Sequence, residues 1–582
     1  MMKRVIGFVL MWCCVSVQAN PSQNLSELLQ QIWQFELVAN PINATSYGQH
    51  QYDALLPDIS ASGLAKNNQQ RQAFVAELNK FSDADLSQQQ QINKAFQLRE
   101  LQNAIDEYRY HAHYMPLTSE SGFHSSLAFL PQSTRFKNVA DYQNYLSRLS
   151  QFPDWFSQQI HWMQQGMQVG LTQPKAVLKD YEKGVKAFIT ATPEQSVYYR
   201  PFAQFDAKSF DKTTVQKLQK QARDVIQNKV FVAYQNYYDF LRRDYIPAAR
   251  DSIAAKDWPD GEAFYQNRTA FYTTTAMTPA QIHQLGLSEV KRIRGEMQAI
   301  IDKLQFDGDL ADFIHYLRTD PRFYAKTADE LMAKAAVIAK TLDAKLPSLF
   351  GKLPRRPYGV VPVPDSIAPK YTTGRYIPAA KDDEPGYYWV NTYALDKRPL
   401  YALTALTMHE AVPGHHLQIS LSQEMTDLPE VRRNGYISAF GEGWGLYAEY
   451  LGKEAGMYQN PYDDFGRLSY EMWRACRLVV DTGMHLMGWS RQQAVDYMLA
   501  NTALSEHNIN TEVDRYISWP AQALSYKIGE LTIKRLRKQA EQQLGNKFDL
   551  RAFHDAVLAN GSVPLNVLEQ QIERFIAQTK SN

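Results

Sequence analysis

The stretch MHEAVPGHHL, residues 408–417, places His409, Glu410, His415 and His416 close together. Neutral imidazoles and one carboxylate are the usual protein ligands of a catalytic zinc ion, which keeps one position open for water. A Glu directly after the first His matches the general base of the zinc peptidases that carry an HExxH motif. The stretch therefore predicts a zinc site with His409 as a ligand and Glu410 as the catalytic base.

The spacing of the histidines departs from HExxH, in which the two ligands lie one helical turn apart. Here the next imidazole belongs to His415, and an unbroken helix would turn it roughly 120° away from His409. Pro413 cannot donate to the preceding turn and Gly414 permits unusual backbone angles. We therefore predict a kink that returns His415 to the metal, with His416 as a second-layer residue or a substrate contact.

A second stretch, GEGWGLYAEY at residues 441–450, follows at a distance that suits the next helix. Its Glu442 is the predicted third metal ligand. Glu449 lies two turns later on the same face of that helix. It is expected either to orient a ligating histidine or to pair with a surface arginine, and the sequence leaves these alternatives open.

These two stretches resemble the HExxPGHH and EGWxLYxE signatures of a large bacterial group, domain-of-unknown-function family 885, over about residues 30–575. That group is similar in pattern to the gluzincins, zinc peptidases that include thimet oligopeptidase, the angiotensin-converting enzyme and dipeptidyl peptidase III. The resemblance implies a large multi-helix fold with His409, His415 and Glu442 as ligands and Glu410 as base. The extra residues before Gly-His leave the choice between His415 and His416 open.

The first nineteen residues, MMKRVIGFVLMWCCVSVQA, have a basic start, an apolar centre and a small-residue end. This pattern predicts a secretory signal peptide and an exported, periplasmic protein, because the apolar run is too short for a membrane span. Cys13 and Cys14 suggest lipoprotein anchoring as an alternative. It is less favoured because bulky Trp12 stands where a small residue is expected.

The charges are nearly balanced, with 62 basic and 61 acidic residues. This balance gives no electrostatic reason to expect a nucleic acid or an anionic membrane as partner. Removal of the signal peptide leaves Cys476 as the single cysteine, so no disulfide framework is expected. The oligomeric state stays open.

The hydrophobic spacing predicts a mainly α fold. Apolar residues recur at three- and four-residue intervals through most of residues 20–349, the predicted N-terminal helical region. Residues 350–582 form the predicted catalytic region, continuous with it. Short runs rich in Val, Tyr, Pro and Gly at residues 354–391 predict a small antiparallel sheet. By the gluzincin resemblance, Tyr387–Asn391 is an edge strand that binds peptide backbone, with Tyr388 and Asn391 as substrate contacts; the alternative is a structural hairpin.

The late helices contain further candidate residues. Arg477, Asp481 and His485 recur at helical spacing, and His485 is either a catalytic side chain beside the zinc or part of a structural ion-pair ladder. Arg515, Tyr516 and Gln522 are similar to an Arg-Tyr pair and Gln of angiotensin-converting-enzyme-like peptidases. In those enzymes the Tyr hydroxyl donates to the oxyanion, a role for which Tyr526 competes with Tyr516. Arg515 is the candidate for binding a terminal carboxylate.

Together these patterns predict an exported zinc metallopeptidase that hydrolyses short peptides, with zinc as cofactor. A metal-dependent amidase acting on cell-wall or other small amides is one alternative. A zinc-stabilised binding protein without catalysis is another, although a structural zinc site has no use for Glu410.

Overall fold

The computed structural model describes residues 21–206, 209–365, 367–379 and 384–581. The predicted signal peptide, residues 1–19, lies outside the described residues. The described part confirms the mainly α prediction, with one small sheet among many helices. No helix in these ranges has both the length and the apolar character needed to cross a membrane.

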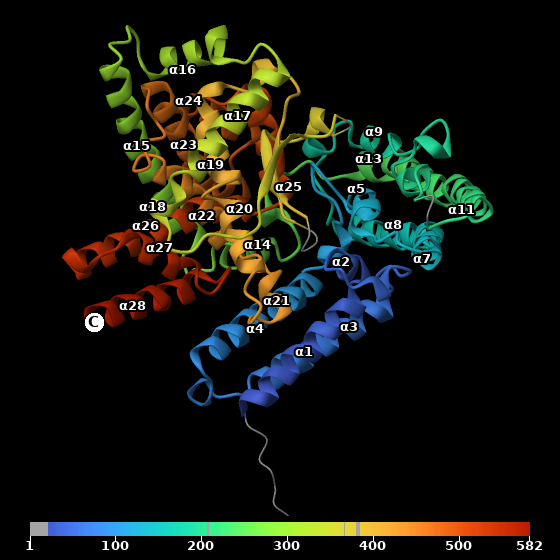
Figure 1. Cartoon of the computed structure of the whole chain (residues 1–582). Coiled ribbons are helices and arrows are strands. Elements are labelled where there is room, and N and C mark those ends of the chain that lie inside the picture. Colours follow the sequence, from blue (N-terminus) through green and yellow to red (C-terminus); the bar gives the residue numbers. More distant parts are fainter. Residues whose placement is uncertain (1–20, 207–208, 366, 380–383, 582) are drawn as a thin grey trace, which may run out of the picture.

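Helices occupy most of the chain up to residue 349 (Figure 1). Ser87 illustrates how they begin: its hydroxyl accepts from the Gln90 amide, and the Gln90 side chain accepts from the Ser87 amide, a reciprocal helix cap. The helices of this region are α1 (Pro21–Ala39), α2 (Pro41–Ser46), α3 (Ala61–Leu78), α4 (Gln88–Arg109), α5 (Phe123–Ser126), α6 (Leu130–Ser133), α7 (Val139–Ser150), α8 (Phe152–Val169), α9 (Tyr181–Lys186), α10 (Arg200–Ala203), α11 (Lys212–Val225), α12 (Phe231–Phe240), α13 (Ile246–Ala248), α14 (Gly261–Thr273), α15 (Pro279–Lys303), α16 (Leu310–Thr319), α17 (Ala328–Asp343) and α18 (Leu346–Leu349).

The second half of the chain returns to helices after the sheet. Its longest helix, α23, is buried from Phe465 to His485 and packs against α15, while α22 packs against α26. These helices are α19 (Leu403–Glu410), α20 (His415–Gln423), α21 (Glu430–Arg433), α22 (Ser438–Leu451), α23 (Pro461–Leu486), α24 (Arg491–Asn501), α25 (Glu506–Ser518), α26 (Ser525–Leu544), α27 (Leu550–Leu558) and α28 (Leu565–Ser581).

The sheet has three strands, β1 (Tyr358–Pro362), β2 (Gly374–Ile377) and β3 (Gly386–Val390), in the order β1-β3-β2. β2 and β3 are antiparallel, but β1 and β3 are parallel. The prediction of a small antiparallel sheet therefore holds for the β2–β3 pair and is wrong for the β1–β3 pair. β3 is the central strand, so the prediction that Tyr387–Asn391 is a peptide-binding edge strand was also wrong. Strand order depends on long-range pairing that strand patterns do not reveal, and here β2 is an edge.

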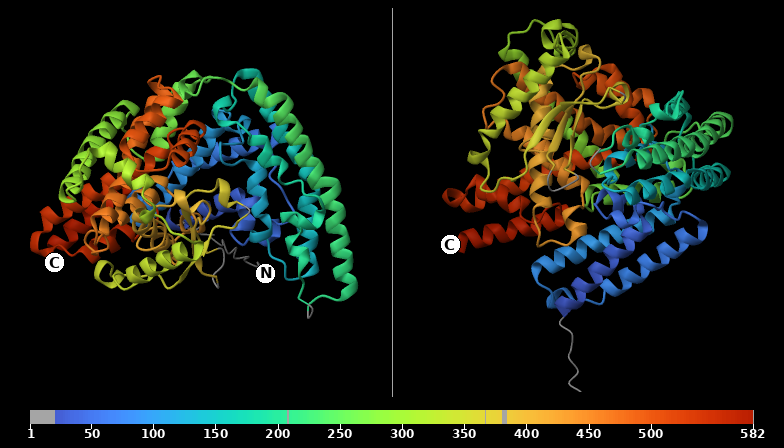
Figure 2. Two further views of the ribbon diagram at one scale, coloured as in Figure 1. Left: turned by 90° about the horizontal axis from the view of Figure 1, so that it is seen from above. Right: turned by 45° about the vertical axis from the view of Figure 1, so that its right-hand side comes forward.

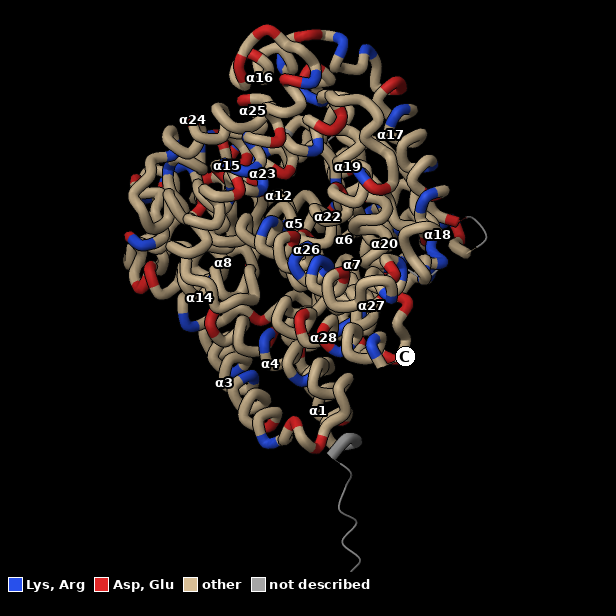
Figure 3. The backbone as a smooth tube through the Cα atoms, turned by 90° about the vertical axis from the view of Figure 1, so that its left-hand side faces the viewer, with Lys and Arg blue, Asp and Glu red and all other residues tan. Residues whose placement is uncertain are grey.

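The blue-to-green helices lie beside the lime-to-red ones (Figure 2), and the lime helix α15 packs against α23 of the second half of the chain. One hydrophobic cluster contains buried side chains from both halves of the chain; Leu117 is its first member in the sequence and Ala523 its last. Residues of both charge signs are interspersed along the backbone (Figure 3), in line with the small formal net charge of +1.

A buried ion network joins three of the long helices. The Lys527 ammonium on α26 lies 2.8 Å from Glu471 on α23, 3.1 Å from Glu289 on α15 and 2.6 Å from Glu530. Burial opposes this charge, but the three carboxylates raise the pKa of Lys527. Because these buried charges lie on different helices and pair with one another, the network joins α26 to α15 and α23.

Candidate metal centre

The candidate ligands lie on two helices separated by a break. α19 ends at Glu410 and α20 begins at His415, so the chain forms two helices where the sequence predicts one kinked helix. A Cβ atom at Gly414 would lie 2.0 Å from the carbonyl oxygen of His409, so only glycine fits this close approach. Trp444 of α22 donates its indole N–H to the Pro413 carbonyl at 2.8 Å and fastens the break to the neighbouring helix.

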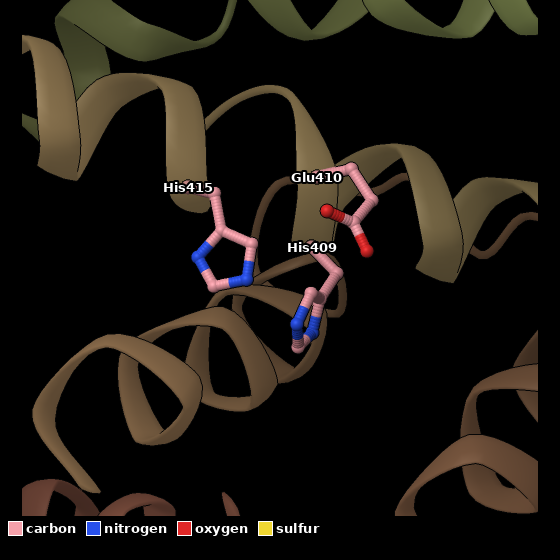
Figure 4. Close-up of side chains that lie close together, drawn as sticks. All are labelled: His409, Glu410 and His415. Carbon is pink, nitrogen blue, oxygen red and sulfur yellow. The ribbon is translucent and has the colours of Figure 1, made fainter. Parts of the chain in front are cut away.

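The break brings the two predicted histidine ligands together (Figure 4). The rings of His409 and His415 lie 4.7 Å apart and nearly perpendicular, at 89°. The Nε2 atoms of His409 and His415 each lie 3.5 Å from the Glu442 carboxylate. The Glu442 side chain keeps 14% of its surface exposed, so solvent reaches the cluster.

These separations fit a tetrahedral zinc site. With metal–ligand bonds of about 2.1 Å, two ligand atoms of a tetrahedral site lie roughly 3.4 Å apart, close to the 3.5 Å between each imidazole nitrogen and Glu442. The donor set of two imidazoles and one carboxylate is also one that catalytic zinc sites use. His409, His415 and Glu442 are therefore suited to hold a zinc ion.

Carboxylates surround His409 and make the centre electronegative. The Glu449 carboxylate accepts from His409 Nδ1–H at 2.8 Å, which directs Nε2 toward Glu442. Arg474 lies 3.3 Å from the same Glu449 oxygen, so Glu449 both orients the histidine and pairs with an arginine. Burial lowers the pKa of His409, but Glu442, Glu449 and Glu410 outweigh it and raise the pKa to about 9. Two imidazoles among three carboxylates favour a bound cation.

Glu449→Gln is expected to lower zinc affinity by roughly 10–100-fold, because the charged acceptor that polarises the His409 ring is lost. Competition with a calibrated chelator measures this change, and Glu573→Gln, an exposed glutamate on α28, is the control. Wild-type affinity in Glu449→Gln would show that the His409–Glu449 contact does not support metal binding.

The packing of α22 against α19 depends on a small residue. A Cβ atom at Gly445 would lie 2.6 Å from Cε1 of the His409 ring. Glycine at this position therefore lets α22 pass close to the histidine, which brings Glu442 and Glu449 of the same helix to opposite sides of the His409 ring.

Glu410 contacts the edge of the sheet. The two atoms that lie 3.5 Å from the Glu442 carboxylate are instead the Nε2 atoms of His409 and His415. The amide N–H of Tyr376, on β2, donates to a Glu410 carboxylate oxygen at 2.8 Å. Glu410 is partly exposed, and one of its oxygens lies within 4.8 Å of ring nitrogens of His409 and His415. The carboxylate thus adjoins both the candidate metal ligands and the free edge of β2.

The structure distinguishes the two tyrosine candidates. Tyr526 stacks beside His409, with ring centroids 6.4 Å apart. The Tyr516 hydroxyl is fully buried and already engaged: it donates to Glu512 and accepts from Trp473 and Arg477, each at 2.8 Å. Tyr516 is therefore not available as an oxyanion donor, which corrects that prediction.

Tyr436 is a site residue that sequence reasoning missed. Its hydroxyl donates to Glu442 at 2.9 Å, and its ring lies 6.4 Å from that of His415. Burial and the Glu442 carboxylate raise the pKa of Tyr436, although 42% of the residue is exposed. Its position shortly before α22 carries no motif, so only its hydrogen bond identifies it.

Three other predicted site residues have structural roles instead. His485 is fully buried, donating to the Tyr516 carbonyl and accepting from the Ala255 amide. Tyr388 is fully buried with its hydroxyl 3.3 Å from Thr407. The Asn391 amide donates to three backbone carbonyls of residues 368–372. These predictions were wrong because a helical or strand pattern does not reveal which polar side chains become buried structural contacts.

His416 and Arg515 are also held by neighbouring groups. His416 donates to the Arg356 carbonyl and accepts from the Tyr376 hydroxyl, so it supports β2 and is not positioned as a substrate contact. Burial lowers the pKa of His416 to about 4. Arg515 lies 3.0 Å from Glu512 and donates to Gln522, which makes it a less accessible carboxylate receptor than predicted.

Solved structures resemble the chain over nearly its full length. The crystal structure of a "putative lipoprotein" from Colwellia psychrerythraea has a TM-score of 0.87 and 29% sequence identity, and the match covers 96% of this chain and 99% of that chain. A "putative lipoprotein of unknown function" from Shewanella oneidensis has a TM-score of 0.70 and 19% identity, covering 95% of this chain and 100% of that chain. The second likeness concerns the fold alone.

Sequence comparison points to a family whose function is not known. No curated protein matches the chain. The model of a bacterial protein family of unknown function, DUF885, matches residues 41–572. This match spans most of the sequence and includes every candidate ligand, and the chain therefore belongs to the DUF885 family.

Proposed function

We propose that this protein is a zinc-dependent peptidase that hydrolyses short peptides. One observation carries the proposal: the Nε2 atoms of His409 and His415 converge on Glu442, each 3.5 Å from its carboxylate, with Glu410 adjoining the cluster. A structural zinc site needs ligands only, whereas a hydrolytic site also needs a base next to the metal. Glu410 supplies that group.

Each residue of the candidate centre would have a separate role in amide hydrolysis. A zinc ion held by His409, His415 and Glu442 would supply Lewis-acid activation of water and of the substrate carbonyl. Glu410 would take a proton from the attacking water and return it to the leaving amine. Tyr526, whose ring lies beside that of His409, would donate a hydrogen bond from its hydroxyl to the developing oxyanion.

The edge strand β2 would orient the substrate. Tyr376 directs its amide N–H away from β3 and toward Glu410. The free polar groups of an edge strand pair readily with an extended peptide. A peptide added along β2 would therefore present its backbone amides next to the base.

An exported location fits this activity. The first nineteen residues predict a signal peptide, and two similar solved structures are both described as putative lipoproteins. We propose that the protein acts on peptides in the periplasm.

A mixed pool of short peptides tests the proposed function. Incubation with the zinc-loaded protein should give new fragments in mass spectra, a chelator should abolish them, and added zinc should restore them. Cell-wall peptide fragments form a parallel arm. Cleavage confined to that arm would contradict a general peptidase in favour of an amidase, and no cleavage in either arm would reject the hydrolase proposal.

A further inference from the structure

The two oxygens of the Glu442 carboxylate have different surroundings. Oε2 lies 3.5 Å from Nε2 of His409 and 3.5 Å from Nε2 of His415. Oε1 accepts a hydrogen bond from the Tyr436 hydroxyl at 2.9 Å, because an ionised carboxylate has no hydrogen to donate. One oxygen of Glu442 therefore faces the imidazole nitrogens, while the other is held by a tyrosine.

This difference matters because a carboxylate can bind a metal ion through one oxygen or through both. Catalytic zinc sites use three protein ligands and keep a further position for water or substrate. A carboxylate that bound through both oxygens would take up part of that position. A hydrogen bond to Oε1 favours binding through Oε2 alone, and such bonds to ligating carboxylates support metal affinity.

The segment that carries Tyr436, between α21 and α22, is anchored on both sides of the tyrosine. Before it, Arg432 is fully buried and donates to Asn93 of α4 at 2.9 Å. After it, the Ile437 amide donates to the Ser562 hydroxyl at 2.8 Å. Helix α4 belongs to the N-terminal half and Ser562 to the turn before α28. Elements remote in sequence thus fix the backbone on either side of Tyr436.

Gly441, directly before Glu442 on α22, makes room for the Tyr436 ring. A Cβ atom at this position would lie 2.3 Å from Cε2 and 2.5 Å from the hydroxyl oxygen of Tyr436, well inside ordinary contact distance. The ring is the movable end of a side chain that is 42% exposed, so an added methyl group would displace the ring rather than the helix. Glycine is therefore the residue that lets the hydroxyl reach Glu442.

We propose that Tyr436 is a positioning residue of the candidate metal centre: its hydroxyl holds Oε1 of Glu442, so that the carboxylate binds the metal ion through Oε2 alone and leaves a position for water. This inference rests on the zinc site of the proposed function and not on the hydrolysis itself. Tyr436 acts through Glu442, whereas Glu410 is the proposed base and Tyr526 the proposed oxyanion donor.

The zinc affinity of Tyr436→Phe, measured without substrate by competition with a calibrated chelator, is the first test. The affinity should fall roughly 10–100-fold, the usual loss when a group that orients a ligand is removed. Tyr47→Phe is the matched control, because Tyr47 is exposed to a similar extent, 38%, and follows α2 in the N-terminal region. It should bind zinc as the wild type does. Wild-type affinity in Tyr436→Phe would reject the positioning role.

Cobalt(II) substituted for zinc reports the coordination directly, which a merely structural role for Tyr436 would not alter. Cobalt(II) with four ligand atoms absorbs visible light more strongly than cobalt(II) with more. The wild type should show the stronger absorption, and Tyr436→Phe should show a loss of intensity because Glu442 can then bind through both oxygens. Identical spectra would overturn the assignment of one-oxygen binding to Tyr436.

Gly441→Ala tests the same contact while the hydroxyl is still present. Because the methyl group should displace the Tyr436 ring, zinc affinity should fall about as far as in Tyr436→Phe. The losses should not add in the double variant, since both changes break one hydrogen bond. Gly295→Ala is the control, because a Cβ atom at this position of α15 meets open space. Additive losses would show that Gly441 and Tyr436 act independently, against the proposal.

Kinetics separate this inference from the proposed function. Weakened zinc binding and an altered cobalt spectrum in Tyr436→Phe, with no peptide hydrolysis by the wild type, would keep the positioning role and reject the peptidase. Hydrolysis by the wild type, with unchanged metal binding and spectrum in Tyr436→Phe, would keep the peptidase and reject the positioning role. A lower kcat in Tyr436→Phe at unchanged zinc affinity would place Tyr436 on the substrate instead, which also contradicts the inference.

Discussion

Glu410→Gln is expected to lower the rate of peptide hydrolysis roughly 10²–10⁴-fold, the range that general acid–base catalysis contributes. The substitution removes the proton acceptor, yet the Gln carbonyl oxygen still accepts from the Tyr376 amide that now contacts Glu410 at 2.8 Å. Because Glu410 is not among the atoms that converge on Glu442, zinc content should stay at the wild-type value. Steady-state kinetics and elemental analysis on the same preparations measure both quantities.

The matched control is Glu77→Gln, a substitution on α3 of a side chain that is 53% exposed. Its hydrolysis rate should equal that of the wild type. Equal rates in Glu410→Gln and the wild type would end the proposal that Glu410 is the base. A fall in rate together with loss of zinc would instead make Glu410 a metal ligand.

His415→Ala is expected to remove zinc binding, with a loss in affinity of at least about 100-fold, since a ligand contributes more than the groups that orient it. The neighbouring His416→Ala should retain zinc, because His416 binds the Arg356 carbonyl and the Tyr376 hydroxyl. The pair compares adjacent histidines of one helix. Elemental analysis after dialysis gives the zinc content of each variant.

Thermal unfolding supplies a second measurement for this pair. A ligand that binds only the folded state raises its stability, so a chelator should lower the melting temperature of the wild type and of His416→Ala. It should have no effect on His415→Ala. Zinc retained by His415→Ala and lost from His416→Ala would reverse the ligand assignment.

The convergence of the candidate ligands could be predicted from local patterns. Pro413 lacks a backbone N–H and Gly414 permits unusual backbone angles, so both interrupt a helix through their own backbone chemistry. The break they cause lies between His409 and His415. Glu442 and Glu449 follow at helical spacing on α22, so one helix presents both to His409. The site residues found in this way belong to short, densely patterned segments.

The residues outside these segments could not be assigned in the same way. Tyr388, Asn391 and His485 were predicted at the site, but each is buried with its polar atoms engaged by neighbouring groups. Periodicity states which face of an element a residue occupies, but not which other element covers that face. The predicted edge strand became the central strand for the same reason.

For this protein, the order of residues along the chain was enough to establish a mainly helical fold and a cluster of His and Glu side chains around the Pro-Gly break. Helical periodicity and backbone restrictions act over a few residues, so they can be recognised in the sequence. The position of Tyr526 beside His409, the burial of Tyr516 and the contact of β2 with Glu410 were decided by tertiary packing. Each depends on segments far apart in the chain that meet only when the hydrophobic core forms.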